Sequence, residues 1–461
     1  MHETIFCNFV QTTVHAGHEG QFTLDIIIRI MPIFEYKVSQ STLILFYCYY
    51  ANIFMSIVST KMYSTKYIMV FVLLIRYNCS YSNPLDFLLD IKSDPEIYMN
   101  ISEIIRKQGY AVEEHEITTN DDYILCLVRL YTNQSSYRSR KVVLLQHGLL
   151  DSSHAWVMNL RNQSLGYILA DYGYDVWLGN SRGSTYSKKH KHFNSSQMEY
   201  WDFSWQEMSS YDFPATVKYI TSITKTKQLS YVGFSQGSLI AMTALDAIPE
   251  LQSYINLFIA LGPVGYFASI KGVFLPLVHH YKIVQFIVEY LTNGEVLPSG
   301  QYLKFLGKYV CGLDPYLCML IINSIAGNDG LNTNLTRLPL IIAHSPAGTS
   351  IKNLVHFSQM INSHLLQKFD YGQYLNRHIY GQNNPPIYTL ERFNIPTVIY
   401  HGGNDYLCTN ESIDLLKQRI NKTIISVNYI DNYNHLGYFW STNAVHRIYS
   451  SLLGLIAKYQ R

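Results

Sequence analysis

Five short apolar runs, each ended by a glycine or a polar turn residue, constrain the fold of this chain more than any other feature. The runs are KVVLLQHG, YDVWLGNSRG, LSYVGF, LFIALGP and IPTVIYHGGND. Continuous apolar runs of this length are typical of strands that are buried on both faces of a parallel sheet. Helix-like stretches lie between them, at residues 164–171, 212–221 and 239–247. The alternation predicts an α/β fold in which helices cover a mostly parallel central sheet.

A long insertion interrupts this alternation after LFIALGP. Its apolar stretches, such as GVFLPLVHHYKIVQFIVEYL, are helix-like, and strand patterns are few. We interpret the insertion as a cap over the sheet. The sequence therefore predicts a core in two parts, residues 83–264 and 391–461, and a mainly helical cap at residues 265–390. A hairpin with its turn at residues 120–122 precedes the first buried run.

The stretch GFSQG places Ser235 between Gly233 and Gly237, where a strand-like run ends and a helix-like run begins. The pattern Gly-x-Ser-x-Gly alone is weak, because it arises by chance in roughly one chain in seven of this length. The strand-turn-helix context is what a nucleophile elbow requires, and glycines relieve clashes in so sharp a turn. Ser235 is therefore the candidate nucleophile.

A serine hydroxyl needs a base to take its proton and a carboxylate to orient that base. Asp405 follows a glycine pair in YHGGNDYLC, and His435 lies in NYNHLGYFW. Taken singly, Asp405 fits an ordinary turn and His435 an ordinary loop. Their order after Ser235 is that of the α/β-hydrolase triad, which favours a catalytic role. The backbone amides of Leu149, in QHGLL, and of Gln236 are the candidate oxyanion donors.

The chain resembles the acid lipase family of gastric and lysosomal lipases. The resemblance runs from about residue 83 to the carboxyl terminus and rests on these stretches: MNISEIIRKQGY, HGLLDSSHAWVMNL, ILADYGYDVWLGNSRG, DFSWQEMSSYDFPATVKYI, GFSQG, HSPAGTS, FDYG, GGNDYL and YNHLGYFW. It implies an α/β-hydrolase fold and a serine hydrolase that cleaves esters of long-chain fatty acids without a cofactor. The implied substrates are acylglycerols or sterol esters.

The resemblance also assigns residues. Its triad falls on Ser235, Asp405 and His435, and its oxyanion amides fall on Leu149 and Gln236. Its cap disulfide would match Cys311 and Cys318, although they are closer in sequence than the family suggests.

Three positions depart from the family pattern. Phe234 stands where histidine is common, and this puts the local polarity in question. Asp122 replaces a usual glycine in the distant hairpin. Gly437 stands where an acidic residue is common, and this is expected to loosen the loop that holds His435. The first 60 or so residues have no counterpart in the family.

The amino-terminal region predicts export. Residues 62–82 combine a positive flank, an apolar run and a small-x-small cleavage pattern, as a secretory signal does, and would give a mature chain from Asn83. Residues 1–61 would then be an upstream extension of uncertain status. The alternative is a membrane anchor built from the apolar run at residues 43–58.

Two further features favour an oxidising, lumenal compartment. Seven Asn-x-Ser/Thr glycan acceptors follow the proposed cleavage point: Asn100, Asn133, Asn162, Asn194, Asn334, Asn410 and Asn421. Cys311 and Cys318, in CGLDPYLC, would close a short loop there, and two separate thiols remain the alternative. The predicted location is secreted or lysosomal.

Charge and spacing narrow the function classes. With 15% charged residues and a net charge of +2, the chain has no basic surface of the kind that binds nucleic acid. The cysteines and histidines show no metal-ligand spacing, so we expect no metal, and the family resemblance implies that no cofactor is needed. The sequence predicts a hydrolase of lipid esters at a membrane or lipid-droplet interface. A short-chain carboxylesterase and a non-catalytic lipid-binding protein are the alternatives, and no protein partner is indicated.

Overall fold

The computed structural model describes residues 94–132, 141–330 and 332–460. The predicted upstream extension and signal-like segment lie outside the described residues, as do the first residues of the predicted core and the acceptor Asn133.

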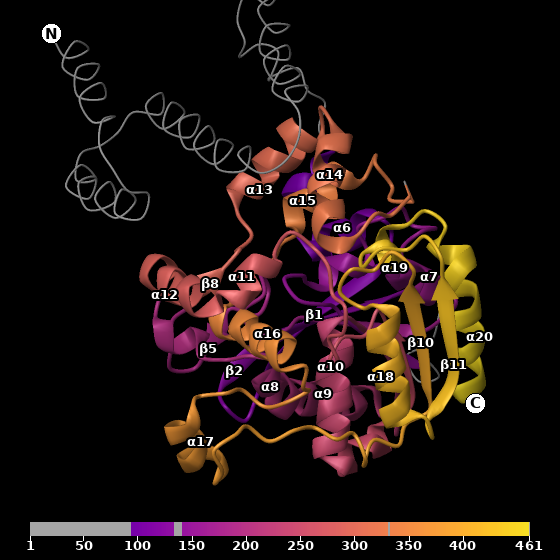
Figure 1. The fold of residues 1–461 in the computed structure, drawn as a ribbon. Helices are drawn as coiled ribbons and strands as arrows, with labels where there is room; N and C mark the ends of the chain where they lie inside the picture. Colours follow the sequence, from indigo (N-terminus) through magenta and orange to yellow (C-terminus); the bar gives the residue numbers. More distant parts are fainter. Residues whose placement is uncertain (1–93, 133–140, 331, 461) are drawn as a thin grey trace, which may run out of the picture. The chain divides into compact units, whose positions relative to one another are not determined.

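A nine-stranded sheet forms the centre of the fold (Figure 1). Its strands are β1 (Ala111–Thr118), β2 (Tyr123–Tyr131), β3 (Val142–Gln146), β4 (Asp175–Gly179), β5 (Lys189–His190), β6 (Leu229–Phe234), β7 (Ile255–Leu261), β10 (Thr397–Gly402) and β11 (Ile424–Ile430). Their order is β1-β2-β4-β3-β6-β7-β10-β11, with β5 paired to β2. Pairing is parallel from β4 to β11 and antiparallel in the β1–β2 hairpin and between β2 and β4. The predicted mostly parallel sheet is confirmed.

Helices connect and cover the strands. The α-helices are α6 (Ile101–Lys107), α7 (Leu165–Asp171), α8 (Trp205–Glu207), α9 (Phe213–Thr224), α10 (Gln236–Ala247), α11 (Leu275–His279), α12 (Tyr281–Thr292), α13 (Gln301–Phe305), α14 (Pro315–Ala326), α15 (Leu338–His344), α16 (Ile351–Ser363), α17 (Gln373–Tyr380), α18 (Asn410–Ile420), α19 (Gly437–Trp440) and α20 (Ser450–Tyr459). The 3₁₀ helices are η3 (Pro95–Tyr98), η5 (Ser153–Trp156), η6 (Met198–Trp201) and η8 (Pro249–Tyr254), and the π-helical segments are η7 (Met208–Asp212), η9 (Leu306–Cys311) and η10 (Val445–Tyr449).

The core has two apolar layers, one on each face of the sheet. Side chains of α9, α10 and α18 pack on one face, for example Val217, Leu239 and Ile413. Side chains of α6, α7 and α20 pack on the other, for example Leu169 and Leu452. Figure 1 shows α18 and α20 on opposite sides of β10 and β11. Since full burial of one such side chain contributes about 1.5 to 3 kcal/mol, both layers hold the strand ends in fixed positions.

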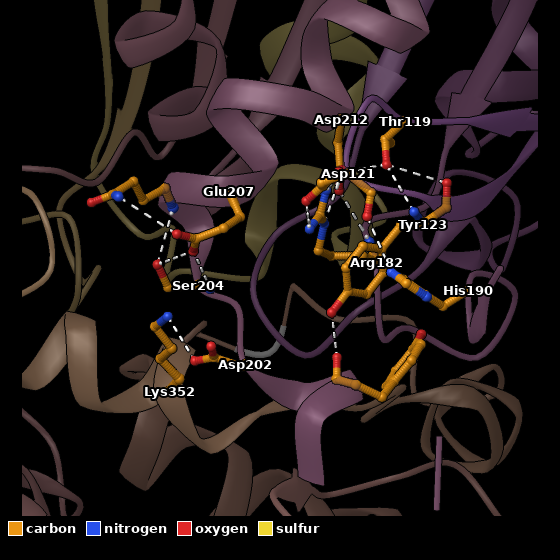
Figure 2. A network of polar contacts seen from close by, with 12 residues as sticks. Thr119, Asp121, Tyr123, Arg182, His190, Asp202, Ser204, Glu207, Asp212 and Lys352 are labelled. Atoms are coloured by element: carbon orange, nitrogen blue, oxygen red, sulfur yellow. Dashed lines mark hydrogen bonds and ion pairs between the residues drawn. The ribbon is translucent and has the colours of Figure 1, made fainter. Parts of the chain in front are cut away.

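A buried arginine ties the β1–β2 hairpin to this core (Figure 2). Arg182, in the loop after β4, donates to Asp121 of the hairpin turn and to Asp212 before α9, at 2.6 and 2.9 Å. Its guanidinium also lies 3.9 Å from the ring centroid of Tyr123. Because its buried charge is paired on two sides, Arg182 can fix the loop that begins at Ser181.

The segment between β7 and β10 is mainly helical and contains α11 to α17. One antiparallel ribbon interrupts it, formed by β8 (Glu295–Val296) and β9 (Thr349–Ser350). The apolar stretch predicted as helix-like forms two helices, α11 and α12, which are separated at His280. Within the described residues no single helix is long and apolar enough to cross a membrane, while the bent pair Gln301–Cys311 and Pro315–Ala326 meets that test by length and composition.

Cys311 and Cys318 form a disulfide that joins the end of η9 to α14. Both are buried, and they pack with Met319 and Leu338 in a small apolar cluster of the cap. Cys126 and Cys408 are free and buried. Cys7, Cys48 and Cys79 lie outside the described residues.

Replacing both Cys311 and Cys318 with alanine is expected to lower the free energy of unfolding of the cap by about 2 to 3 kcal/mol, because the bond closes a short loop in the unfolded chain. Thermal unfolding and limited proteolysis of the parent and the double variant would measure this. Replacing the free Cys126 with alanine is the matched control for the loss of a buried sulfur. Equal protease resistance of the cap in parent and double variant would contradict the prediction.

Candidate active site

Ser235 lies in a sharp turn between β6 and α10, with φ of 51° and ψ of −117°. A non-glycine residue in this conformation costs about 1 to 3 kcal/mol, so its surroundings must hold it there. Its N–H donates to the carbonyl of Leu261 at 3.0 Å, and its carbonyl accepts from the amide of Ser238 at 2.9 Å. This is the geometry of a nucleophile elbow, in which the hydroxyl stands clear of the strand and the helix.

The two flanking glycines are required by close backbone contacts. A Cβ atom at Gly237 would lie 2.6 Å from the carbonyl oxygen of Gln146 at the end of β3. A Cβ atom at Gly233 would lie 2.8 Å from the amide nitrogen of Ser238. Helix α10 therefore begins at Gln236, three residues before the predicted start at Leu239, and packs directly against the end of β3.

The structure brings Ser235, His435 and Asp405 into one hydrogen-bonded row. The distance between His435 Nε2 and Ser235 Oγ is 2.8 Å. His435 Nδ1 lies 2.9 Å from both carboxylate oxygens of Asp405. Since a carboxylate only accepts, Nδ1 carries the proton and Nε2 is free to accept the proton of the serine hydroxyl. All three side chains are buried.

Asp405 is held by donors of its own loop and of α19. Its Oδ1 accepts from the amides of Leu407 and Cys408, at 2.9 and 2.7 Å. Its Oδ2 accepts from the hydroxyl of Tyr438 at 2.9 Å. The carboxylate is thus fully engaged and cannot rotate away from His435 without losing these bonds.

The loop of His435 is fixed by the cap. The backbone amide of His435 donates to the carbonyl of Ala326, at the end of α14, at 3.1 Å. The side-chain amide of Asn434 donates to the carbonyl of Gly327 at 2.9 Å. The position of the base therefore depends on where α14 ends.

The two predicted oxyanion donors flank the nucleophile. Gln236 is the first residue of α10, so its amide is one of those that no helical carbonyl satisfies. Leu149 follows Gly148, where a Cβ atom would lie 3.1 Å from the Cβ of Ser235. Gln236 is therefore adjacent to the serine in the chain and Leu149 follows a residue in contact with it, so both stay candidates for the oxyanion donors.

His147 supports the loop before Leu149. Its Nε2 accepts from the amide of Ser181 at 3.0 Å, so the ring proton is on Nδ1, which donates to the carbonyl of Gly148 at 2.7 Å. Burial lowers the pKa of His147 to about 4. His147 is therefore neutral near pH 7, and both of its ring nitrogens are bonded to backbone groups.

Two family profiles match this chain. The one described as "Partial alpha/beta-hydrolase lipase region" matches residues 101–160, and the one described as "alpha/beta hydrolase fold" matches residues 141–442. The human "Lysosomal acid lipase/cholesteryl ester hydrolase" is 40% identical over 374 residues, which are 80% of this chain and 93% of the relative. The "Gastric triacylglycerol lipase" of Bos taurus is 38% identical over 385 residues, 82% of this chain and 96% of the relative.

The chain belongs to the acid lipase family of α/β hydrolases. Among solved structures, a soluble variant of monoglyceride lipase from Saccharomyces cerevisiae matches with a TM-score of 0.47 and 14% identity, over 75% of this chain and 96% of that one.

Two of the departures from the acid lipase pattern lie inside the site. The Phe234 ring packs against the His435 ring, with centroids 5.0 Å apart, and fills the space above Gly148. Gly437 is buried beneath Tyr433, whose Cγ would lie 2.9 Å from a Cβ at this position. In this acid lipase the expected loosening at Gly437 is therefore countered by close packing of Tyr433.

Two residues of this acid lipase site were not predicted from the sequence. Tyr438 donates to Asp405, and Asn353 of α16 donates to the side-chain carbonyl of Gln236 at 2.8 Å. Tyr438 lies three residues after His435, a spacing that would have suggested a common face if the segment had been predicted as a helix. Nothing in the local sequence marks Asn353. Within the described residues, no group of three or more His, Cys, Asp or Glu side chains is arranged to hold a metal.

Proposed function

We propose that this acid lipase cleaves carboxylic esters of long-chain fatty acids in lipids, acylglycerols or sterol esters, through an acyl-enzyme on Ser235. The observation that carries the proposal is the row of hydrogen bonds from Ser235 Oγ through His435 to Asp405, at a strained elbow. The printed activities of the lysosomal and gastric relatives support the substrate class.

In the acylation step, His435 Nε2 accepts the proton of Ser235 Oγ as that oxygen bonds to the ester carbonyl carbon. The carbonyl oxygen becomes an oxyanion, to which the amides of Leu149 and Gln236 donate. Asp405 stabilises the imidazolium. As the oxyanion re-forms the carbonyl, the ester C–O bond breaks and the imidazolium gives its proton to the leaving oxygen, which departs as the alcohol. Water, activated by His435 in the same way, attacks the acyl-enzyme and releases the fatty acid.

Exposed apolar side chains on the cap suggest that the enzyme acts at a lipid surface. On α12, five apolar side chains are exposed at helical spacing: Ile283, Phe286, Ile287, Tyr290 and Leu291. On α14, Tyr316, Leu317, Leu320 and Ile321 are exposed as well. Exposed apolar helix faces mark sites of contact with membranes or with other proteins, and the lipid-ester activities printed for the relatives favour a lipid surface. Because Ser235 is only 5% exposed, access of a lipid requires displacement of the chain that covers it.

Replacing Phe286 and Leu291 with aspartate is expected to weaken adsorption to phospholipid-coated triolein droplets by roughly tenfold per residue, since each side chain loses about 1.5 to 3 kcal/mol of apolar transfer. Flotation with the droplets measures adsorption, while turnover of a soluble short-chain ester checks the site. Leu415→Asp, at an exposed apolar position of α18 outside the cap, is the matched control. Unchanged flotation of the double variant would rule out α12 as a lipid-contacting helix.

The ester panel that tests the function compares trioleoylglycerol, cholesteryl oleate and a short-chain ester, each at acid and neutral pH. Long-chain hydrolysis above the short-chain rate supports the proposal. A preference for the short-chain ester would instead assign a carboxylesterase, and binding without hydrolysis would assign a lipid-binding protein.

We further propose that the chain is exported and acts in the lysosome or after secretion. Support comes from the signal-like sequence, the Cys311–Cys318 disulfide and the surface position of most described glycan acceptors. Asn100, Asn162, Asn194, Asn410 and Asn421 are exposed.

Asn334 is the exception among the acceptors, since it is buried and its side-chain amide donates to Gln163 Oε1 at 3.0 Å. In active protein from a secretory host, we expect glycans at exposed acceptors and none at Asn334, because a glycan would remove this donor and cannot be buried. Glycopeptide mapping of the active fraction gives the occupancy. Active protein that carries a glycan at Asn334 would refute the expectation, and a wholly unglycosylated product would argue against export.

A further inference from the structure

Tyr438 is a buried tyrosine whose hydroxyl belongs to the site and has no role in the steps above. The hydroxyl donates to Asp405 Oδ2 at 2.9 Å, and the same oxygen lies 2.9 Å from His435 Nδ1. One carboxylate oxygen thus receives two donors, one from the base and one from the phenol.

The surroundings of Tyr438 fix its hydroxyl on the carboxylate. Its side chain is fully buried. A Cβ atom at Gly262 would lie 2.7 Å from the ring, so the ring has no room to swing on that side. Its backbone carbonyl accepts from the hydroxyl of Tyr449 at 2.9 Å. Burial, together with the charge of Asp405, raises the pKa of Tyr438 well above its ordinary value, so the hydroxyl stays protonated and remains a donor.

We propose that Tyr438 is a positioning residue that sets the proton affinity of His435 through Asp405, an inference that rests on the proposed function. A hydrogen bond to a carboxylate stabilises its charge and weakens it as an acceptor for other donors. The imidazolium of His435 is therefore stabilised less than it would be by a carboxylate without this bond. The result is a base that stays neutral, and able to accept the serine proton, at lower pH.

Other titratable groups near the pair must be separated from this effect. His401, on β10, and the thiol of Cys408 both interact with the charge of Asp405. Burial lowers the pKa of His401 and raises that of Cys408, so both are neutral near pH 7. His401 could still titrate in acid, and a His401 variant is needed to exclude it as the source of an acid limb.

The test is the pH profile of kcat/KM for a soluble ester, with active sites counted by a phosphonate label. Tyr438→Phe removes only the hydroxyl and should raise the midpoint of the acid limb by about half a pH unit, which is about a threefold loss below the limb. On the alkaline side, kcat and KM should stay within a few-fold of the parent. Tyr433→Phe removes a neighbouring buried hydroxyl that bonds Asn443 and should leave the midpoint in place. His401→Gln should leave the upward shift of the Tyr438 variant intact.

A second variant guards against misfolding of the first. Tyr438→3-fluorotyrosine, introduced by amber suppression, keeps the hydroxyl and makes it a stronger donor, so the midpoint should move down. Shifts of opposite sign in the two variants support the proposal. The proposal is overturned if the midpoint is unchanged, or if the Tyr438→Phe variant loses the same factor in kcat/KM at every pH. Tyr438 would then be a packing residue. If the parent protein neither hydrolyses esters nor reacts with the phosphonate, the result contradicts the proposed function and not the role of Tyr438.

Discussion

Replacing Ser235 with alanine is expected to lower kcat by about 10⁴-fold or more while the fold and lipid adsorption persist. Without Oγ no acyl-enzyme forms, and only the oxyanion amides and substrate binding remain. Because the triad acts as a unit, adding His435→Ala to Ser235→Ala should cost little more than the first change. Steady-state hydrolysis and labelling by a phosphonate, followed by peptide mapping, would measure both effects.

The matched control for this change is Ser230→Ala, at the far end of β6, where the hydroxyl bonds Asn256. Ser238 is closer but unsuitable, because its hydroxyl donates to the carbonyl of Gly233 and supports the elbow itself. The Ser230 variant should keep its rate within a few-fold. A Ser235→Ala enzyme with parental activity would contradict the proposed function.

Replacing Asp405 with asparagine is the second large effect that we expect, a fall in kcat of roughly 10⁴-fold. The amide preserves the shape and the acceptor for the amides of Leu407 and Cys408. It also presents a donor to His435, which favours the tautomer whose Nε2 carries the proton and so cannot accept one from Ser235. Turnover and the rate of phosphonate labelling should fall together.

Asp246→Asn provides the control for Asp405, since Asp246 is a buried carboxylate that accepts the backbone amide of Arg392 and lies at the end of α10 remote from Ser235. Its rate should stay near that of the parent. A rate for Asp405→Asn within tenfold of the parent would show that the carboxylate is not needed for the base.

The strands that carry the site follow directly from the sequence pattern. KVVLLQ, LSYVGF and PTVIYHG are mostly apolar because strands inside a parallel sheet are covered on both faces, and they form β3, β6 and β10. The edge strand β11 was not predicted. Its sequence, IISVNYI, includes Asn428, and most of its residues are only partly buried or exposed, so the continuous apolar signal is missing.

Some residues of the candidate site can be predicted from the local sequence, whereas others are recognised only from tertiary packing. Ser235, Asp405 and His435 are found from the sequence because each follows a recognisable turn, and the structure brings them together. Tyr438 and Asn353 are not found, because their roles depend on how α19 and α16 pack against other elements. Residue type alone does not distinguish such a buried tyrosine or asparagine from one that only fills space.

The cap inserted between β7 and β10 has a consequence for the time at which activity arises. Ser235 and His435 are 200 residues apart in sequence, on opposite sides of that insertion. A ribosome that adds about 5 to 20 residues per second needs roughly 10 to 40 seconds to make the intervening chain. Throughout that interval the nucleophile has no base, and β7 has no β10 beside it. This lipase is therefore unable to attack esters until the last part of its own translation.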